Sequence, residues 1–317
     1  MKPSTLIKSA VPLCLAATLS MPAQAGWLDW LFKDTYTETR HPIVLIHGMF
    51  GFDDVVGVDY FYQVADELSR SGAEVYTIQV SALNSTEVRG EQAWAQIQDI
   101  IATSGADKVN IIGHSHGGPT ARYVASLHPD TVASVSSVAG VNWGSAVADV
   151  YRQYLEEGSA AGGTVAAIGN AFGDLITWAS SGDGLPQDLD ASIDSLTTEG
   201  SVAFNAQYPE GMPGTYCGEG NEVGSNGVRY YSWSGASSFT GSYFDILDYI
   251  SATTSLAFDE PNDGLVSSCS SHLGKVIRDD YDQTHFDEIN QLMGMVGSDD
   301  PIPLYRNQAN RLKNLGL

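Results

Sequence analysis

Short apolar runs alternate along this chain with longer segments that have apolar residues at helical spacing. The first run, HPIVLIHG at 41–48, is rich in β-branched residues and ends in glycine, as buried parallel strands do. The further strands expected in this part are 73–80, 108–114 and 132–140, and the expected helices are 60–68, 88–101 and 117–127. Strand and helix in this order predict a parallel sheet with helices on both faces.

The pattern changes between Gly144 and Pro213, where glycines, small residues and helical spacings replace the strand signal. Within this segment, 165–179 predicts an amphipathic helix with Phe172 on its apolar face and Asp174 on its polar face. We interpret 144–213 as an insertion above the edge of the sheet formed by the carboxyl ends of the strands, where ligands bind. The apolar face of the helix either packs on the core or forms a lid that turns outward at a lipid surface.

The last third of the chain returns to the strand pattern. Strands are expected at VRYYSWSG, 228–235, and at KVIRDDY, 275–281. A closing helix is expected at FDEINQLMG, 286–294. The order of elements therefore predicts a single α/β domain.

The first 25 residues have the three parts of a secretory signal. Lys2 and Lys8 precede the apolar run AVPLCLAATL, and the small-residue pattern AQA marks the cleavage site. A membrane anchor would need about twenty uninterrupted apolar residues, and this run is shorter. Lipid modification of Cys14 is the other alternative, but the leucine before it is larger than such sites usually carry. We therefore exclude 1–25 from the fold and predict a secreted protein.

The mature chain is expected to be strongly acidic. The full 317-residue chain has a formal charge of −23, and loss of the signal removes two lysines and no acid, which gives −25. This charge argues against nucleic acid as a partner and favours a solvated, soluble surface. Cys14 leaves with the signal, so Cys217 and Cys269 remain as the pair that could form a disulfide after export.

The sequence GHSHG at 113–117 stands where an expected strand meets an expected helix. It fits the G-x-S-x-G elbow, a tight turn that holds a nucleophilic serine above a sheet and that only glycine enters without a clash. In a chain with 33 glycines, roughly a few tenths of a match to this motif are expected by chance, so the interpretation depends on the flanking strand and helix. They predict Ser115 as a nucleophile.

A serine nucleophile needs a histidine base, and the histidine needs a carboxylate, in the order Ser, acid, His in this fold. His116 and His128 belong to the elbow and to the helix after it, so neither can approach the serine from a separate loop. His285 follows the last strand and is the predicted base. His272, close after the second mature cysteine, is the alternative.

The predicted acid is Asp263, which stands in an Asn-Asp-Gly turn that can project its carboxylate from a constrained loop. Asp259 and Glu260 are the alternatives, since the turn could exist only for its geometry.

An oxyanion intermediate needs two backbone N–H donors. One belongs to the residue after the nucleophile, here His116, and the other to the loop after the first core strand, here Met49 in HGMFG.

Seven segments, spread over nearly the whole mature chain, carry a resemblance to a known family. They are HPIVLIHGMFGFD, GHSHGGPTARYVA, CGEG, YYSWSG, NDGLVSSCSSHLGKVIRDDY, HFDEINQ and YRNQANRLKN. Together they resemble the secreted bacterial true lipases of the Pseudomonas and Burkholderia type. The resemblance implies an α/β-hydrolase fold, a lipid ester substrate at an oil–water interface, and a membrane-bound foldase in a two-step secretion route through the periplasm. The implied site residues are Ser115, Asp263 and His285 as triad, Met49 and His116 as oxyanion donors, and Cys217 with Cys269 as a disulfide.

The resemblance also implies one structural calcium ion, bound by the side chains of Asp245 and Asp287 and by the backbone carbonyls of Gln291 and Met295. Calcium prefers several hard oxygen ligands, which carboxylates and carbonyls supply. The sequence departs from the family pattern near TGSYFDILD, which leaves Asp248 as an alternative, and in an added GWLDWLF at 26–32. Because Asp287 stands two residues past the predicted base, the ion would fix the loop that presents it.

The predicted function is that of a secreted triacylglycerol lipase. A carboxylesterase acting on soluble short-chain esters is the alternative within the same chemistry. A catalytically silent, hydrolase-like binding protein is the alternative from another class, and the intact order of serine, aspartate and histidine argues against it.

Overall fold

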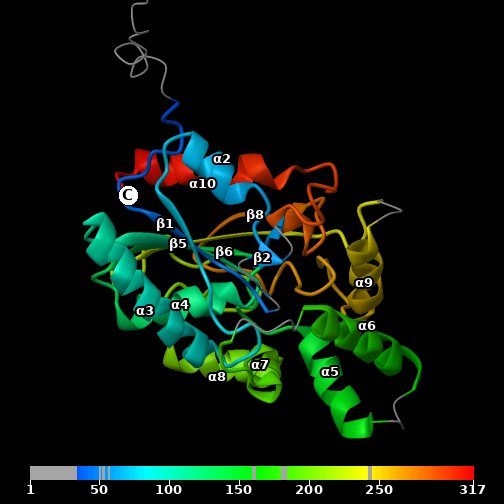
Figure 1. Ribbon diagram of the computed structural model, residues 1–317. Coiled ribbons are helices and arrows are strands. Elements are labelled where there is room, and N and C mark those ends of the chain that lie inside the picture. The colour runs from blue at the N-terminus through cyan, green and yellow to red at the C-terminus, as the bar shows by residue number, and fades with distance from the viewer. Residues whose placement is uncertain are drawn as a thin grey trace, which may run out of the picture. The chain divides into compact units, whose positions relative to one another are not determined.

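The computed structural model describes residues 34–49, 51, 54–55, 58–158, 162–179, 184–241 and 245–317. A six-stranded parallel sheet forms the centre of the domain, with the strand order β4-β1-β5-β6-β7-β8 (Figure 1). Its strands are β1 (Ile43–Ile46), β4 (Val75–Ile78), β5 (Val109–His114), β6 (Val132–Val138), β7 (Arg229–Gly235) and β8 (Lys275–Tyr281). A separate antiparallel pair is formed by β2 (Asp54–Val55) and β3 (Val58–Asp59). The α/β-hydrolase class expected from the sequence is confirmed.

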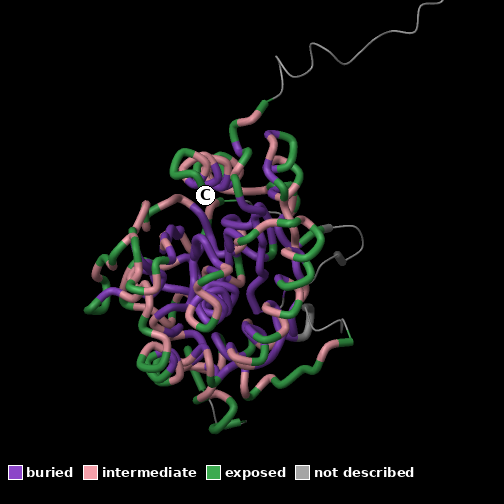
Figure 2. The backbone as a smooth tube through the Cα atoms, turned by 90° about the vertical axis from the view of Figure 1, so that its left-hand side faces the viewer, coloured by how far each residue is buried: buried purple, intermediate pink, exposed green. Residues whose placement is uncertain are grey.

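Helices cover both faces of this sheet. α2 (Val64–Arg70) and α10 (Pro301–Asn314) lie on one face, and α3 (Thr86–Ser104) and α4 (Gly117–Leu127) lie on the other (Figure 1). Strand β1 shows the reason, because successive side chains of a strand point to opposite faces. Ile43 and Leu45 pack with Tyr305 of α10, whereas Val44 and Ile46 pack with the apolar residues of α3 and α4. The buried positions of Figure 2 accordingly concentrate in the sheet and on the inner sides of its helices.

Four helices fill the segment between β6 and β7, and we call residues 144–213 the cap. They are α5 (Ala146–Glu157), α6 (Gly163–Ala179), α7 (Leu189–Leu196) and α8 (Thr198–Gln207), and the described residues of the cap contain no strand. In α6, Ile168, Phe172 and Leu175 are buried while Asn170 and Asp174 are exposed, as the amphipathic pattern predicts. α6 packs against α5 and against α9 (Ile246–Thr254), which η2 (Ser255–Ala257) continues.

The prediction of a closing helix at 286–294 is wrong. Only one 3₁₀ turn forms there, η3 (Asp287–Ile289), and the last helix of the chain is α10. Asn290 has a φ of 64°, in the left-handed region that ends helices, and the Asp287 carboxylate is turned inward to accept three hydrogen bonds. α10 begins later because Asp300 caps its first turn and Pro301 stands at its first position.

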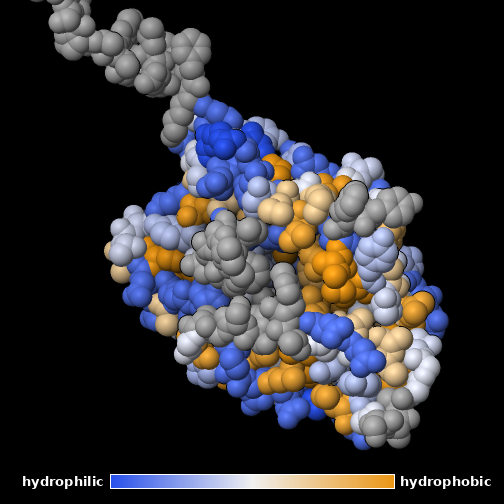
Figure 3. Space-filling model, turned by 45° about the vertical axis from the view of Figure 1, so that its right-hand side comes forward, coloured by the Kyte–Doolittle hydropathy of each residue, from blue (hydrophilic) through white to orange (hydrophobic). Residues whose placement is uncertain are grey.

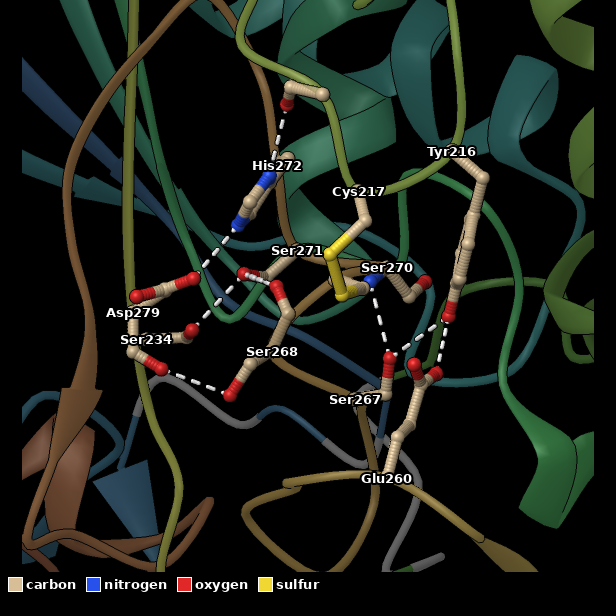
Figure 4. The surroundings of a disulfide bond; sticks show 12 residues. Tyr216, Cys217, Ser234, Glu260, Ser267, Ser268, Ser270, Ser271, His272 and Asp279 are labelled. Carbon is tan, nitrogen blue, oxygen red and sulfur yellow. Dashed lines mark hydrogen bonds and ion pairs between the residues drawn. A yellow bond between two sulfur atoms is a disulfide. The ribbon is translucent and has the colours of Figure 1, made fainter.

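Cys217 and Cys269 form a disulfide, which confirms the expected pairing (Figure 4). It joins the segment that enters β7 to the loop between η2 and β8. The predicted signal peptide at 1–25, Cys14 and the GWLDWLF segment lie outside the described residues. Within the part that is described, no helix is long and apolar enough to cross a membrane.

Candidate active site

Ser115 stands at the turn between β5 and α4 with a φ of 57°, a conformation that is uncommon and strained for a residue other than glycine. The two glycines of the motif are required by space. A Cβ atom at Gly113 would lie 2.1 Å from the carbonyl oxygen of Gly117, and one at Gly117 would lie 2.3 Å from that of Ile46. The strand-to-helix elbow inferred from the sequence is therefore present, with Ser115 above the carboxyl end of the sheet.

Asp263 and His285 are joined by side chain and main chain. His285 Nδ1 lies 2.8 Å from Asp263 Oδ2, and the His285 amide donates to the Asp263 carbonyl oxygen at 2.9 Å. The other carboxylate oxygen accepts from the amides of Leu265 and Val266 at 2.8 and 2.7 Å, and the aspartate is fully buried. The carboxylate is thus fixed in one orientation, aimed at one nitrogen of the imidazole.

The alternative acids and bases are engaged elsewhere. Asp259 is exposed, and the Glu260 carboxylate accepts a hydrogen bond from Tyr216. His272 contacts the Gly218 carbonyl through Nδ1 at 2.8 Å and Asp279 through Nε2 at 2.9 Å, beside the disulfide (Figure 4). Both nitrogens of His272 are therefore occupied away from the elbow.

The two other histidines near the elbow in sequence also have structural partners. His128 ends α4 and stacks on Trp94, with 3.7 Å between the ring centroids. His116 is fully buried and contacts Thr86 Oγ1 through Nε2 at 2.9 Å. Burial holds the pKa of His116 well below its usual range, so the ring is neutral at pH 7.

Ser115 and His285 line the same pocket, and its wall is otherwise almost entirely apolar. The other lining residues are Met49, Tyr60, Val141, Ser145, Ala148, Phe172, Leu196, Leu265, Val266 and Phe286. No aspartate, glutamate, lysine or arginine is among these described residues. Phe172 belongs to α6, and Ser115 is only 7% exposed, so the cap covers the serine in this structure.

The loop after β1, residues 47–49, passes directly over the elbow, and we call it the oxyanion loop. A Cβ atom at Gly48 would lie 2.6 Å from Ser115 Cβ, so the backbone of Gly48 and Met49 reaches the serine only because Gly48 lacks a side chain. Among the hydrogen bonds of the described residues, none uses the amides of Met49 or His116.

Arg89 supports this loop, and sequence reasoning missed it. It comes from α3, is fully buried, and its Nη2 donates to the carbonyl oxygens of His47 and Gly48 at 2.6 and 3.2 Å. Nothing in the sequence distinguishes it from the surface arginines of an amphipathic helix, because the carbonyl oxygens that it holds in this loop are some forty residues away.

A second buried network lies behind the serine. The Gly48 amide donates to the Tyr60 hydroxyl at 3.0 Å, and that hydroxyl lies 2.7 Å from Nδ1 of His114. His114 Nε2 lies 3.4 Å from a carboxylate oxygen of Glu288, whose other oxygen accepts from the Gly235 amide. Burial holds the pKa of His114 well below its usual range and raises the pKa of Glu288.

Three buried carboxylates gather beside the loop that carries His285. Asp245, Asp248 and Asp287 each place an oxygen within 4.8 Å of the others, and we call them the acidic cluster. Burial raises the pKa of Asp287 to about 7 and also raises the pKa of Asp245. The Asp287 Oδ1 atom is buried and has no hydrogen-bond partner among the described residues. Such a cluster could bind a metal ion, and it includes both aspartates that the sequence left as alternatives.

The surface around α9 carries several exposed apolar side chains. Its exposed apolar side chains are Phe239, Ile246, Tyr249, Leu256 and Met293. Hydrophobic surface is visible on this side of the molecule in Figure 3. The two aspartates of the α9 segment, Asp245 and Asp248, point inward to the acidic cluster, so they add no charge to this face.

Comparison with known proteins agrees with this geometry. A family described as having the alpha/beta hydrolase fold matches residues 41–288. A triacylglycerol lipase of Vibrio cholerae is 54% identical over 289 residues, which cover 90% of this chain and 92% of that protein. Triacylglycerol lipases of Pseudomonas fragi and Burkholderia plantarii are 40% and 36% identical over 90% and 98% of this chain, and over 100% and 95% of their own lengths.

Solved structures support the fold alone, because their sequences are distant. A lipase of Bacillus licheniformis in its mature form is 18% identical, with a TM-score of 0.58, and covers 86% of this chain and 92% of its own. A Staphylococcus hyicus lipase is 17% identical, with a TM-score of 0.56, and covers 88% of this chain and 98% of its own. Because the family model matches residues 41–288 and the lipases are 36–54% identical over most of the chain, this chain belongs to the α/β-hydrolase family, in the group of bacterial triacylglycerol lipases of the Pseudomonas and Burkholderia type.

Proposed function

We propose that this protein is a secreted lipase that hydrolyses the carboxylic esters of long-chain acylglycerols through an acyl-enzyme on Ser115. The observation that carries the proposal is the 2.8 Å contact of His285 Nδ1 with a fixed, buried Asp263, in a pocket that also holds Ser115 on a strained elbow. Nucleophile, base and acid come from three separate loops, and serine hydrolysis depends on these three groups meeting in one site.

In the proposed mechanism, Ser115 Oγ attacks the ester carbonyl and His285 takes its proton through Nε2. Asp263 holds the proton on Nδ1 and stabilises the imidazolium that forms. The amides of Met49 and His116 bind the oxyanion of the tetrahedral intermediate. His285 then protonates the leaving alcohol, and a water molecule activated by the same histidine releases the fatty acid from Ser115.

The pocket favours a long acyl chain. Its walls are apolar, and burying each methylene of a chain contributes about 0.8 kcal/mol. In this proposal α6 is a lid, because its Phe172 lines the pocket over Ser115 and must move before a bulky glyceride enters. The exposed apolar side chains around α9 provide surface that a lipid droplet would cover.

The acidic cluster fits a calcium ion in this proposal. Three buried carboxylates at close range repel one another unless a cation is present, and Asp287 Oδ1 lacks any other partner among the described residues. Asp245 and Asp287 would hold the ion, with the carbonyls of Gln291 and Met295 on the same loop as Asp287. A bound calcium would supply positive charge that stabilises this loop and no chemistry, since serine hydrolysis needs no metal.

Export through the periplasm and folding with a membrane-bound foldase are part of the proposal. They rest on the signal-like residues 1–25 and on the family resemblance. The disulfide between Cys217 and Cys269 suits an oxidising compartment.

The test compares three proteins and two forms of substrate. The purified enzyme, Ser115→Ala and His272→Asn are assayed on one triglyceride below and above its solubility limit. A lipase gains rate steeply when the substrate forms an emulsion, whereas a carboxylesterase follows the dissolved concentration alone. An organophosphonate must label Ser115 in a one-to-one ratio, and absence of label would make the protein a binding protein. His272→Asn, the control, keeps the activity of the parent.

A further inference from the structure

The peptide groups on both sides of Gly48 are held by side chains. Before the glycine, the His47 carbonyl oxygen accepts from Arg89 Nη2 at 2.6 Å, and the Gly48 amide of the same peptide group donates to the Tyr60 hydroxyl at 3.0 Å. After it, the Gly48 carbonyl oxygen lies 3.2 Å from Arg89 Nη2 and 2.8 Å from His47 Nδ1. The N–H at the far end of this second peptide group is that of Met49.

Side chains have to hold these two peptide groups because the residue that connects them, Gly48, is a glycine. Glycine populates both signs of φ readily, so the direction of the Met49 N–H depends on what holds the two peptide planes. Arg89 contacts the carbonyl oxygens of both planes. Tyr60 holds the amide end of the first plane, which keeps that plane from rotating about its bond to Arg89.

The Tyr60 hydroxyl is itself oriented. It accepts the Gly48 amide proton and keeps its own proton to donate, and Nδ1 of His114 lies 2.7 Å away. His114 is fully buried one residue before Ser115, and burial favours its neutral form, in which Nδ1 can accept. The chain of contacts from Gly48 through Tyr60 to His114 therefore ties the oxyanion loop to the strand that carries the nucleophile.

We propose that Tyr60 is a positioning residue for catalysis, whose hydroxyl sets the direction of the Met49 amide toward the oxyanion. This inference rests on the proposed acyl-enzyme function and on Met49 as an oxyanion donor. Tyr60 also lines the pocket, so a test of the hydroxyl has to keep the aromatic ring in place. Loss of the hydroxyl misaligns one donor without removing it. Removing a donor outright costs a factor of about 10² to 10³ in kcat, so a misaligned one should cost roughly 10- to 100-fold.

The experiment uses Tyr60→Phe in the full mature enzyme, with Tyr305→Phe as its matched control. Tyr305 is also a buried tyrosine of the same core, and its hydroxyl has no hydrogen-bond partner among the described residues. Rates on a soluble ester are divided by the number of sites that an organophosphonate labels, so unfolded protein does not count. An alkyl boronic acid, which forms a tetrahedral adduct with serine, and a long-chain alcohol, which fills the pocket without reacting, are compared as inhibitors.

We expect kcat of Tyr60→Phe to fall roughly 10- to 100-fold with KM changed less than about twofold. The boronic acid should lose affinity by a similar factor, while the alcohol binds as before and Tyr305→Phe matches the parent. An unchanged kcat in Tyr60→Phe would overturn the inference, and so would a higher KM with equal weakening of both inhibitors, which indicates only a pocket wall. Failure of the parent enzyme to take up phosphonate would instead refute the proposed function.

Discussion

His285 and Asp263 are joined twice, by the 2.8 Å contact of Nδ1 with Oδ2 and by the 2.9 Å hydrogen bond between the histidine amide and the aspartate carbonyl oxygen. The two residues are 22 positions apart, so the backbone bond brings two loops together and the side-chain contact uses that closeness. The pair is therefore assembled before a substrate arrives, and catalysis does not have to order it.

Ser115→Ala and His285→Ala should each remove nearly all ester hydrolysis. The first change removes the nucleophile, and the second removes the base that takes its proton. The residues act as one unit, so the double variant should lose little beyond the worse single one. Rates on a soluble ester and circular dichroism spectra check the loss and the intact fold. High activity in His285→Ala, combined with loss in His272→Ala, would assign the base to the other histidine.

Gly117→Ala should destabilise the protein and lower its activity together. The new Cβ atom would lie 2.3 Å from the carbonyl oxygen of Ile46, a backbone atom of strand β1 that is paired on both sides and cannot move alone. We expect a loss of about 1–3 kcal/mol in the free energy of unfolding, measured by urea titration. Gly214→Ala is the control, because nothing lies within 4 Å of its added atom. Equal stability of the two variants would contradict the packing of the elbow.

Periodicity was sufficient to predict the parts of the fold that local sequence determines. The strand 108–114 and the helix 117–127 were placed almost to the residue, because their apolar positions are continuous and glycines mark the joint between them. The helix expected at 286–294 failed for the opposite reason. There the Asp287 carboxylate accepts hydrogen bonds from Thr240, 47 positions away, and from Gly297, ten positions away. Both partners lie outside the expected helix, and these contacts override the local pattern.

The residues of the site also fall into those that the sequence predicts and those that only the folded chain shows. Ser115, Asp263 and His285 could be placed from motif and chain order, since each stands at the end of a recognisable element. Arg89 and Tyr60 could not, because both act on the oxyanion loop through contacts that only the folded chain creates. A buried arginine bonded to carbonyl oxygens has no local signature in a sequence.

His116→Gln should make stability less sensitive to acid. Burial lowers the pKa of His116 in the folded state, so between the unfolded value near 6.5 and the lower folded value only the unfolded chain binds this proton. Stability from this residue is therefore present above pH 6.5 and lost as the pH falls. Below pH 6.5 the parent should lose up to about 1.4 kcal/mol per pH unit relative to His116→Gln, in urea titrations from pH 7 to pH 5. If the free energies of unfolding of the parent and of His116→Gln fell in parallel with pH, the folded protein would bind the His116 proton as readily as the unfolded chain, which contradicts the prediction.

The variant with Cys217→Ser and Cys269→Ser should be less stable than the parent, because the disulfide closes a loop with a sequence separation of 52. The chain-entropy model gives about 4 kcal/mol as an upper figure, so Tm should fall by roughly 5–10 °C in calorimetry. Titration of unfolded, unreduced parent enzyme should detect no thiol in the mature chain. Two reactive thiols, or a variant that melts with the parent, would show that the bridge is absent.

Removal of calcium should lower stability and activity together. In the ion-free protein the carboxylates of Asp245, Asp248 and Asp287 are buried within 4.8 Å of one another, so their repulsion works against the loop that presents His285. Prolonged chelation should lower Tm and the rate on a soluble ester, and added calcium should restore both. An ion that binds only the folded state stabilises it by about 2.7 kcal/mol at a hundred times its Kd, so Tm should rise with free calcium.

Asp287→Asn should mimic the chelated enzyme, whereas Asp99→Asn, a change at an exposed acid of α3, should respond to calcium as the parent does. Comparing Asp245→Asn with Asp248→Asn then identifies the second ligand, because only the variant of the true ligand loses the response. A parent enzyme shown by metal analysis to be calcium-free, with Tm and rate unchanged, would refute the site.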